Sequence, residues 1–192
     1  MPAEQPQAHL PKDATWVELT DDLLAKDGER WRLLVDTFKP TKHDEGETMA
    51  KWLRECVHEG SMTRQTRAVY NEHLLGFFAV DPDHYYEVSN QPAPLLAARR
   101  LFGRATQQRG LLITSIVRSD LTAPGFGRVL IEEAVGLALE LESEHEPITA
   151  LLVEPANCDL TRMWREKHHF DELARSDQLH LPLKVREELS LN

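Results

Sequence analysis

A β-rich apolar segment at 111–118 leads through a Pro-Gly-Phe-Gly turn directly into an amphipathic helix. We expect this helix over 127–143, because its apolar side chains recur at helical spacing, and a second apolar strand over 148–153 follows it. A strand, a helix and a strand in this order form a parallel pair joined by a right-handed crossover. Strands without polar interruptions belong at the buried centre of a sheet. The segment therefore predicts an α/β fold.

The turn places Gly125 and Gly127 at the carboxyl end of the first strand, where a parallel sheet forms a crevice for ligands. The first amides of a helix lack partners and the helix dipole favours negative charge, so phosphate-like anions bind there. Glycine also lets a ligand approach the main chain closely. The turn predicts an anion site, and a tight connection without a ligand is the alternative. A P-loop and a Rossmann fingerprint are excluded, because the Gly-Lys-Ser/Thr ending and the third glycine are missing.

The rest of the chain supplies elements that can flank this unit. Helices are also expected over 20–38, 46–58 and 160–167. In the first of them, Asp21 and Asp22 offer N-cap chemistry, and Asp27-Gly28 favours a break into two shorter helices. Strands are expected over 67–70, 74–80 and 178–183, with turns at 81–83 and 90–94. Residues 95–109 fit either a helix or an irregular connection.

The length of 192 residues fits one domain with a full hydrophobic core. Residues 1–13 combine Pro, Gln and charge without a period, so we expect a disordered or loosely docked tail and a single domain over 14–192. The 22 Lys and Arg against 32 Asp and Glu give a net charge of -10. This charge opposes binding to a phosphate backbone and favours cationic partners, so a nucleic-acid partner is disfavoured.

The two cysteines, Cys56 and Cys158, lie far apart without paired spacing, which indicates free thiols in a reducing compartment. The N-terminal residues show no signal-peptide pattern, and no apolar run reaches the ~20 residues of a membrane-spanning helix. We therefore expect a cytoplasmic protein without a membrane partner. A metal site at Cys158, His168 and His169 is rejected, because adjacent histidines point apart and no four-ligand spacing exists.

These features resemble the GCN5-related N-acetyltransferase family, whose signature is a strand followed by Q/R-x-x-G-x-G/A at the start of a helix. Residues 122–127 read Thr-Ala-Pro-Gly-Phe-Gly, so both glycines fit and the first position departs. The second signature is visible as Asn157, Trp164 and Phe170, with His169 where a glycine is usual. The resemblance covers about 65–185. It implies a mixed central sheet with a splayed parallel strand pair, flanked by helices.

The resemblance also implies acetyl-CoA, or another acyl-CoA, as co-substrate, and no metal. In the family the turn amides hold the pyrophosphate, and the edge of the preceding strand pairs with the pantetheine amides. The matching strand-edge residues are Ser115, Ile116 and Val117, and the matching cradle residues are Ala123, Pro124, Gly125, Phe126, Gly127 and Arg128. Asn157 and Trp164 are expected at the cofactor too. Helix capping by Asn157 and core packing by Trp164 are the alternatives.

The family's reaction is direct attack of a neutral amine on the acetyl thioester, which needs a base for the amine and an acid for the thiolate. Trp164 stands at the position of the family's acid tyrosine, and an indole donates hydrogen bonds but no proton near neutral pH. Glu87, Glu154 and Cys158 are candidates for the base. The catalytic residues therefore stay unassigned.

The sequence thus predicts an N-acetyltransferase that acts on a primary amine of a small molecule or a protein. A small polyamine-like or aminoglycoside-like amine, or a protein amine, fits the net charge better than an aminoacyl-tRNA. The competing hypothesis is a catalytically degenerate acyl-CoA sensor or partner-binding module. A third is an α/β domain without a ligand. A homodimer is compatible with all three.

Overall fold

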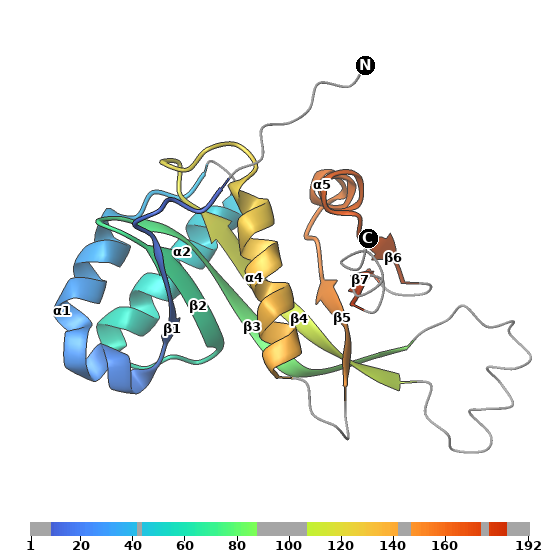
Figure 1. Ribbon diagram of the computed structural model, residues 1–192, viewed down its shortest axis with the longest axis horizontal. Helices are drawn as coiled ribbons and strands as arrows, with labels where there is room; N and C mark the ends of the chain where they lie inside the picture. The colour runs from blue at the N-terminus through green and yellow to red at the C-terminus, as the bar shows by residue number, and fades with distance from the viewer. Residues whose placement is uncertain (1–8, 42–43, 88–106, 142–146, 174–176, 184–192) are drawn as a thin grey trace, which may run out of the picture. The chain divides into compact units, whose positions relative to one another are not determined.

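The computed structural model describes residues 9–41, 44–87, 107–141, 147–173 and 177–183 (Figure 1). The chain divides into two compact units, one of residues 1–80 with 114–134 and one of residues 81–113 with 135–192. Strands β3 (Leu74–Glu87) and β4 (Gln107–Arg118) and helix α4 (Phe126–Glu140) run from one unit into the other. The hydrogen-bonded strand order is β1-β2-β3-β4-β5-β7-β6. The predicted α/β class with a mixed sheet is confirmed.

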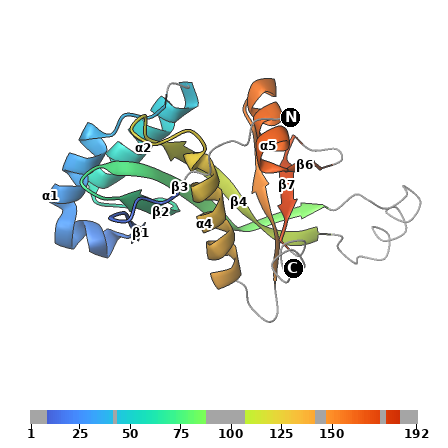
Figure 2. The same ribbon diagram turned by 45° about the horizontal axis from the view of Figure 1, so that its top comes forward.

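The first unit is a sheet between two helical layers (Figure 2). Strands β1 (Thr15–Leu19), β2 (Gln65–Tyr70) and β3 pair antiparallel. Helices α1 (Asp21–Thr37) and α2 (Asp44–Glu59) cover one face, where Trp31, Leu53 and Val117 share a buried cluster. The start of α4 covers the other face, where Leu130 packs with Ile116. Because neighbouring residues of a strand point to opposite faces, β4 contributes to both layers.

Helix α1 begins one residue after Thr20, whose Oγ1 accepts a hydrogen bond from the N–H of Leu23 at 3.2 Å. The cap is therefore Thr20, and the expectation that Asp21 and Asp22 cap this helix is corrected. Both lie in its first turn, where their charge suits the helix dipole. The predicted break is present, because Asp27 has non-helical angles of φ -131 and ψ 28.

The second unit contains the predicted parallel pair. Strand β5 (Ile148–Val153) pairs parallel with β4 from Arg109↔Ile148 to Ile113↔Val153. Helix α5 (Cys158–His168) follows, and then β6 (Asp171–Glu172) and β7 (Leu179–Pro182), which pairs antiparallel with β5 and β6. The buried cluster of this unit is formed by Tyr86, Leu112, Ala150, Leu152 and Leu173.

The structure departs from the sequence prediction in several elements. Strand β3 continues through the predicted turn at 81–83, because Arg109 donates to the carbonyl of Pro82 and pairs with the Asp83 carboxylate, each at 3.0 Å. Residues 107–109 belong to β4, while 88–106, with most of the helix or connection expected at 95–109, lie outside the described residues. Strands β1 and β6 were not predicted.

The segment expected to be a tail is described from residue 9 onward. Leu10 is partly buried and packs against the cluster under α4. Among the described residues, every helix is too short or too polar to cross a membrane.

Candidate functional site

The connection from β4 to α4 is the candidate site, and it lies in the first unit. Gly125 has φ +91, which L-residues rarely adopt, so a glycine is required at this turn. The buried ring of Phe126, 2% exposed, anchors the first turn of α4 beneath the loop. The chain can therefore reverse direction tightly and start a helix at once.

The main chain of this loop leaves three N–H donors without a partner among the described residues. Phe126 N–H donates to the carbonyl of Ala123 at 3.2 Å, and Arg128 N–H donates to that of Gly125 at 2.9 Å. Within the described part of the chain, the N–H groups of Ala123, Gly125 and Gly127 have no acceptor. Among the predicted cradle residues, these two glycines therefore offer unpaired amides at the N-terminus of a helix.

The described residues leave the surface above these donors open. Ala123, Pro124 and Gly125 are exposed. A Cβ built on Gly127 would meet no atom within 4 Å. A ligand can therefore reach the main chain without displacing a side chain of the described residues.

Two guanidinium groups flank the loop. Arg118 Nη1 lies 3.4 Å from both the carbonyl and the hydroxyl oxygen of Thr122. Arg128 Nε pairs with Glu132 Oε1 at 2.9 Å, and its side chain is 63% exposed. Arg118 was not among the predicted site residues. Its guanidinium lies beside Thr122, which occupies the position where the family signature has Gln or Arg. Arg118 ends β4 and Thr122 lies four residues later in the connection to α4, so no sequence pattern predicted their contact.

The edge of β4 is available over a short stretch only. Its pairing with β5 ends at Ile113, and at its far end the carbonyl of Arg118 accepts from Thr41 N–H at 3.1 Å. Ser119 N–H donates to Leu75 of β3 at 2.8 Å. The N–H and C=O groups of successive residues in a strand point alternately to its two sides. The main-chain groups of Ile116 therefore point away from β3, and the main-chain groups of Ser115 and Val117 point toward β3. Within this stretch the main chain of Ile116 faces the free edge of β4, and pairing of Ser115, Ile116 or Val117 with an extended ligand stays a prediction.

Asn157 and Trp164 belong to the second unit. Asn157 caps α5, because its Oδ1 accepts from Leu160 N–H at 2.9 Å. Trp164 is 6% exposed and meets the ring of Phe170 edge to face at a centroid distance of 4.9 Å. The structure thus shows the capping and packing roles that were the alternatives for these residues. Their contact with a cofactor stays a prediction.

The described residues give no acid or base a clear catalytic setting. Glu154 is exposed and accepts a hydrogen bond from Gln178 at 2.6 Å. Cys158 is an exposed free thiol at the first position of α5. Glu87 ends β3, and its side chain lies outside the described residues. Burial raises the pKa of Tyr86, whose hydroxyl bonds to Thr149 at 2.9 Å.

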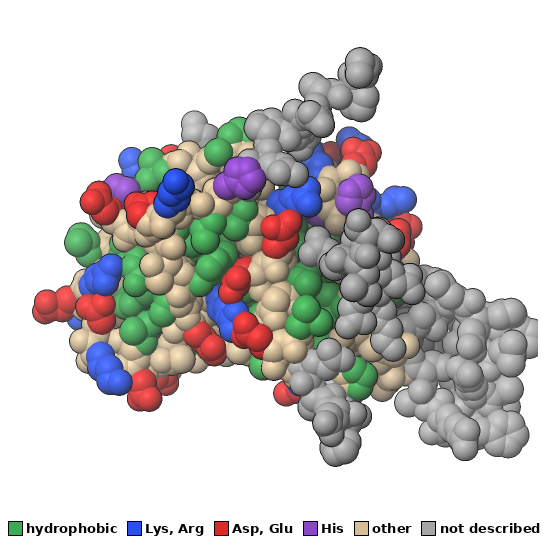
Figure 3. Space-filling model, viewed as in Figure 1, with side chains coloured by type: hydrophobic (Ala, Val, Ile, Leu, Met, Phe, Trp, Pro, Cys, Tyr) green, Lys and Arg blue, Asp and Glu red, His purple; other side chains and the backbone are tan. Residues whose placement is uncertain are grey.

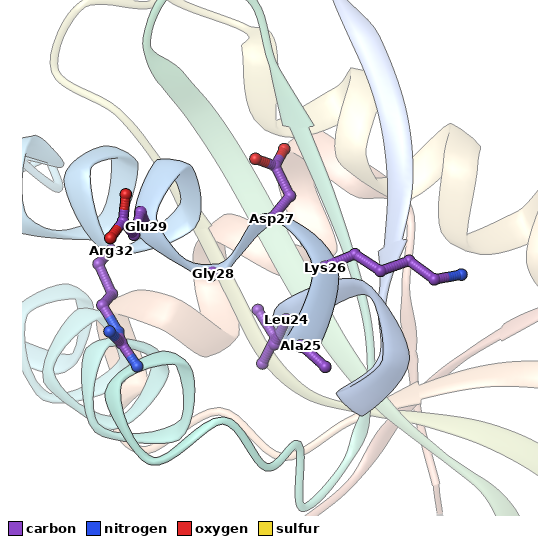
Figure 4. Close-up of a pocket in the computed structure, with 7 residues that line it drawn as sticks. All are labelled: Leu24, Ala25, Lys26, Asp27, Gly28, Glu29 and Arg32. Atoms are coloured by element: carbon purple, nitrogen blue, oxygen red, sulfur yellow. The ribbon is translucent and has the colours of Figure 1, made fainter.

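Two surface hollows are lined by residues outside the loop. One of about 320 Å³ follows the kink of α1, and Lys26, Asp27 and Arg32 around it point in different directions (Figure 4). The other, about 650 Å³, lies along α5 and its C-terminal turn. Across the described residues no group of three His, Cys, Asp or Glu is placed to hold a metal ion.

No family model matches the sequence, and no curated protein is significantly similar to it. Solved structures are similar over nearly the whole chain. AtaT complexed with acetyl-methionyl-tRNAfMet has a TM-score of 0.63 at 16% identity, over 93% of this chain and 99% of that chain. A tyrosine-to-phenylalanine mutant of KacT has a TM-score of 0.62 at 16% identity, over 93% and 99%. AtaTR bound with acetyl-CoA has a TM-score of 0.59 at 17% identity, over 94% and 99%.

At this identity the likeness is one of fold. It covers 93% of this chain and 99% of AtaT. AtaT and KacT are toxins of the acetyltransferase family that the sequence motifs resemble. The chain therefore has the fold of the GCN5-related N-acetyltransferases.

Proposed function

We propose that this protein is an acetyl-CoA-dependent N-acetyltransferase whose β4–α4 loop binds the pyrophosphate of the coenzyme. The observation that carries the proposal is the pair of unpartnered N–H groups at Gly125 and Gly127, at the N-terminus of a helix of 15 residues. Such donors bind anions because the helix dipole adds to their own polarity. The guanidinium groups of Arg118 and Arg128 add positive charge beside the loop. AtaTR with acetyl-CoA shares the fold.

The edge of β4 supplies the second half of this binding mode. The main chain of Ile116 faces away from β3, so it can pair with an amide of the pantetheine arm as an added strand would. The neutral acceptor nitrogen then attacks the thioester carbon and forms the C–N bond while the C–S bond breaks. The nitrogen releases one proton, and the departing thiolate takes up one. The chain's role in this step is to hold the thioester at the strand edge and to admit a neutral amine.

The acceptor in this proposal is a primary amine of a small molecule or of a protein. Net charge -10 favours a cationic amine at long range. Over the first unit in Figure 3, acidic and basic side chains are interspersed. A second candidate is an aminoacyl-tRNA, because AtaT in complex with acetyl-methionyl-tRNAfMet has the same fold. Transfer to tRNA that falls steeply with added salt would favour this second acceptor.

An acyl-CoA-binding protein without transferase activity is the competing function. It is favoured by Trp164 at the position of the family's acid, since an indole supplies no proton. Thiol release should therefore be compared between the natural protein and Trp164→Tyr. Release by either form supports a transferase, whereas acetyl-CoA binding without release by both supports a binding protein.

The proposal is tested by calorimetric titration with acetyl-CoA and with acetyl-pantetheine, which lacks the pyrophosphate. We expect tighter binding of acetyl-CoA, and about 2.7 kcal/mol of stabilisation at a hundredfold excess over its Kd. Arg128→Gln should weaken acetyl-CoA and leave acetyl-pantetheine unchanged. Equal affinity for the two thioesters, or no stabilisation at millimolar acetyl-CoA, contradicts the proposal.

A further inference from the structure

Four side chains meet on the α2 side of β4, opposite the face that α4 covers. Ser115 of β4, 5% exposed, donates from its Oγ to Met49 Sδ of α2 at 2.8 Å. The same Oγ lies 3.4 Å from Arg64 Nη1, which can donate to it. The Arg64 guanidinium lies 5.2 Å above the ring of Trp52, also in α2. We call these four residues, Met49, Trp52, Arg64 and Ser115, the Arg64 cluster.

Arg64 differs from the other arginine of this unit that lies over an aromatic ring. Arg30 lies 4.9 Å from the centroid of Tyr70, and its charge is paired with Asp27 at 3.7 Å. Arg64 has no carboxylate within 4.0 Å among the described residues, although the chain carries ten more acidic than basic side chains. The indole face and Ser115 hold the guanidinium in place while it remains exposed. Its other N–H donors are thus available to an anion.

The cluster lies beside the part of β4 that the proposed function gives to the thioester. Ser115 precedes Ile116, whose main chain faces the free edge. An acceptor held by Arg64 would reach that edge from the α2 side. A planar guanidinium matches a carboxylate or a phosphate, because it donates two parallel hydrogen bonds.

We propose that Arg64, held by Trp52 and Ser115, binds the carboxylate or phosphate of a small zwitterionic acceptor and so presents its amine to the thioester. The inference rests on the proposed function and names the class of its substrate. A zwitterion also fits the charge balance, because net charge -10 opposes an acceptor with a large excess of negative charge. The same charge argues against a polynucleotide as the source of the phosphate.

The test uses the full chain and two pairs of probes that differ in the anionic group. β-Alanine is compared with propylamine, and ethanolamine phosphate is compared with ethanolamine. Binding is followed by NMR through the Trp52 indole and the Arg64 Nε–H signals, with and without CoA, so no turnover is needed. We expect these signals to shift with at least one probe that carries the carboxylate or phosphate, and not with the matched amine that lacks it. The probe that shifts them distinguishes a carboxylate from a phosphate.

The variants are Arg64→Gln and its matched control Arg30→Gln. Arg64→Gln should abolish the shift of the Trp52 signal and lower kcat/KM for an anionic acceptor about tenfold or more, without changing the Kd of acetyl-CoA. Arg30→Gln should change neither. Equal shifts with the probes that carry the anionic group and with those that lack it, or no shift with any of them, overturn the assignment of Arg64. Failure of the proposed function is distinct, because it would appear as lost acetyl-CoA binding in the natural protein.

Discussion

Replacing Gly127 by alanine separates folding from cofactor binding at the loop. Gly127 is the second residue of α4, it has no positive φ, and its added Cβ would meet no atom within 4 Å. Alanine therefore fits the folded chain. It also reduces the freedom of the unfolded chain, so Gly127→Ala should raise the free energy of unfolding by about 0.5–1 kcal/mol.

The same methyl group should weaken acetyl-CoA binding. It would occupy the open surface through which the pyrophosphate approaches the N–H groups of Gly125 and Gly127. A hydrogen bond to a charged oxygen contributes about 1.5–3 kcal/mol. Loss of one such bond raises the Kd of acetyl-CoA roughly tenfold to a hundredfold. A more stable protein that binds its cofactor more weakly is the expected combination.

Two measurements on the same preparations decide this prediction. Urea denaturation gives the free energy of unfolding, and calorimetric titration gives the Kd of acetyl-CoA. Gly136→Ala is the matched control, since Gly136 lies in the same helix and its Cβ would also meet nothing within 4 Å. It should stabilise the fold and leave the Kd unchanged. If Gly127→Ala binds acetyl-CoA as tightly as this control, the pyrophosphate does not approach α4 at Gly127.

Three further predictions concern the fold. His169 is the C-cap residue of α5 and has a left-handed backbone conformation with φ 60. Because glycine adopts this conformation without strain, His169→Gly should raise the free energy of unfolding by about 1 kcal/mol, measured as a higher urea midpoint. Thr20→Ala should lower the free energy of unfolding by about 1 kcal/mol through loss of the cap to Leu23 N–H, and unchanged thermal unfolding would contradict this. Burial raises the pKa of Tyr86 above 10.0, so the unfolded chain releases this proton first and stability should fall as pH rises above about 10. Tyr86→Phe should make denaturation curves less dependent on pH in that range.

Local patterns in the sequence were sufficient to predict the strands and the helix that form the parallel pair. The strand at 148–153 was predicted with the bounds that β5 has, and the helix after the glycine turn begins within one residue of α4. The helix over 46–58 is extended by two residues at its start and one at its end. These elements repeat apolar side chains at their own period, so neighbours in the sequence carry the signal. The glycines of the turn were informative because backbone freedom is a property of the residue itself.

Only the tertiary structure decided which groups meet. The sequence predicted a turn at 81–83, yet a side chain 26 residues away, Arg109, keeps this segment in β3. Which neighbouring strand the main chain of a residue faces depends on the pairing of both strand edges. In β4 this pairing turns the main chain of Ile116 away from β3, and those of Ser115 and Val117 toward β3. The contact of Arg64 with Ser115 joins positions 51 residues apart. Such contacts follow from register and packing across the sheet, for which a single sequence contains no local period.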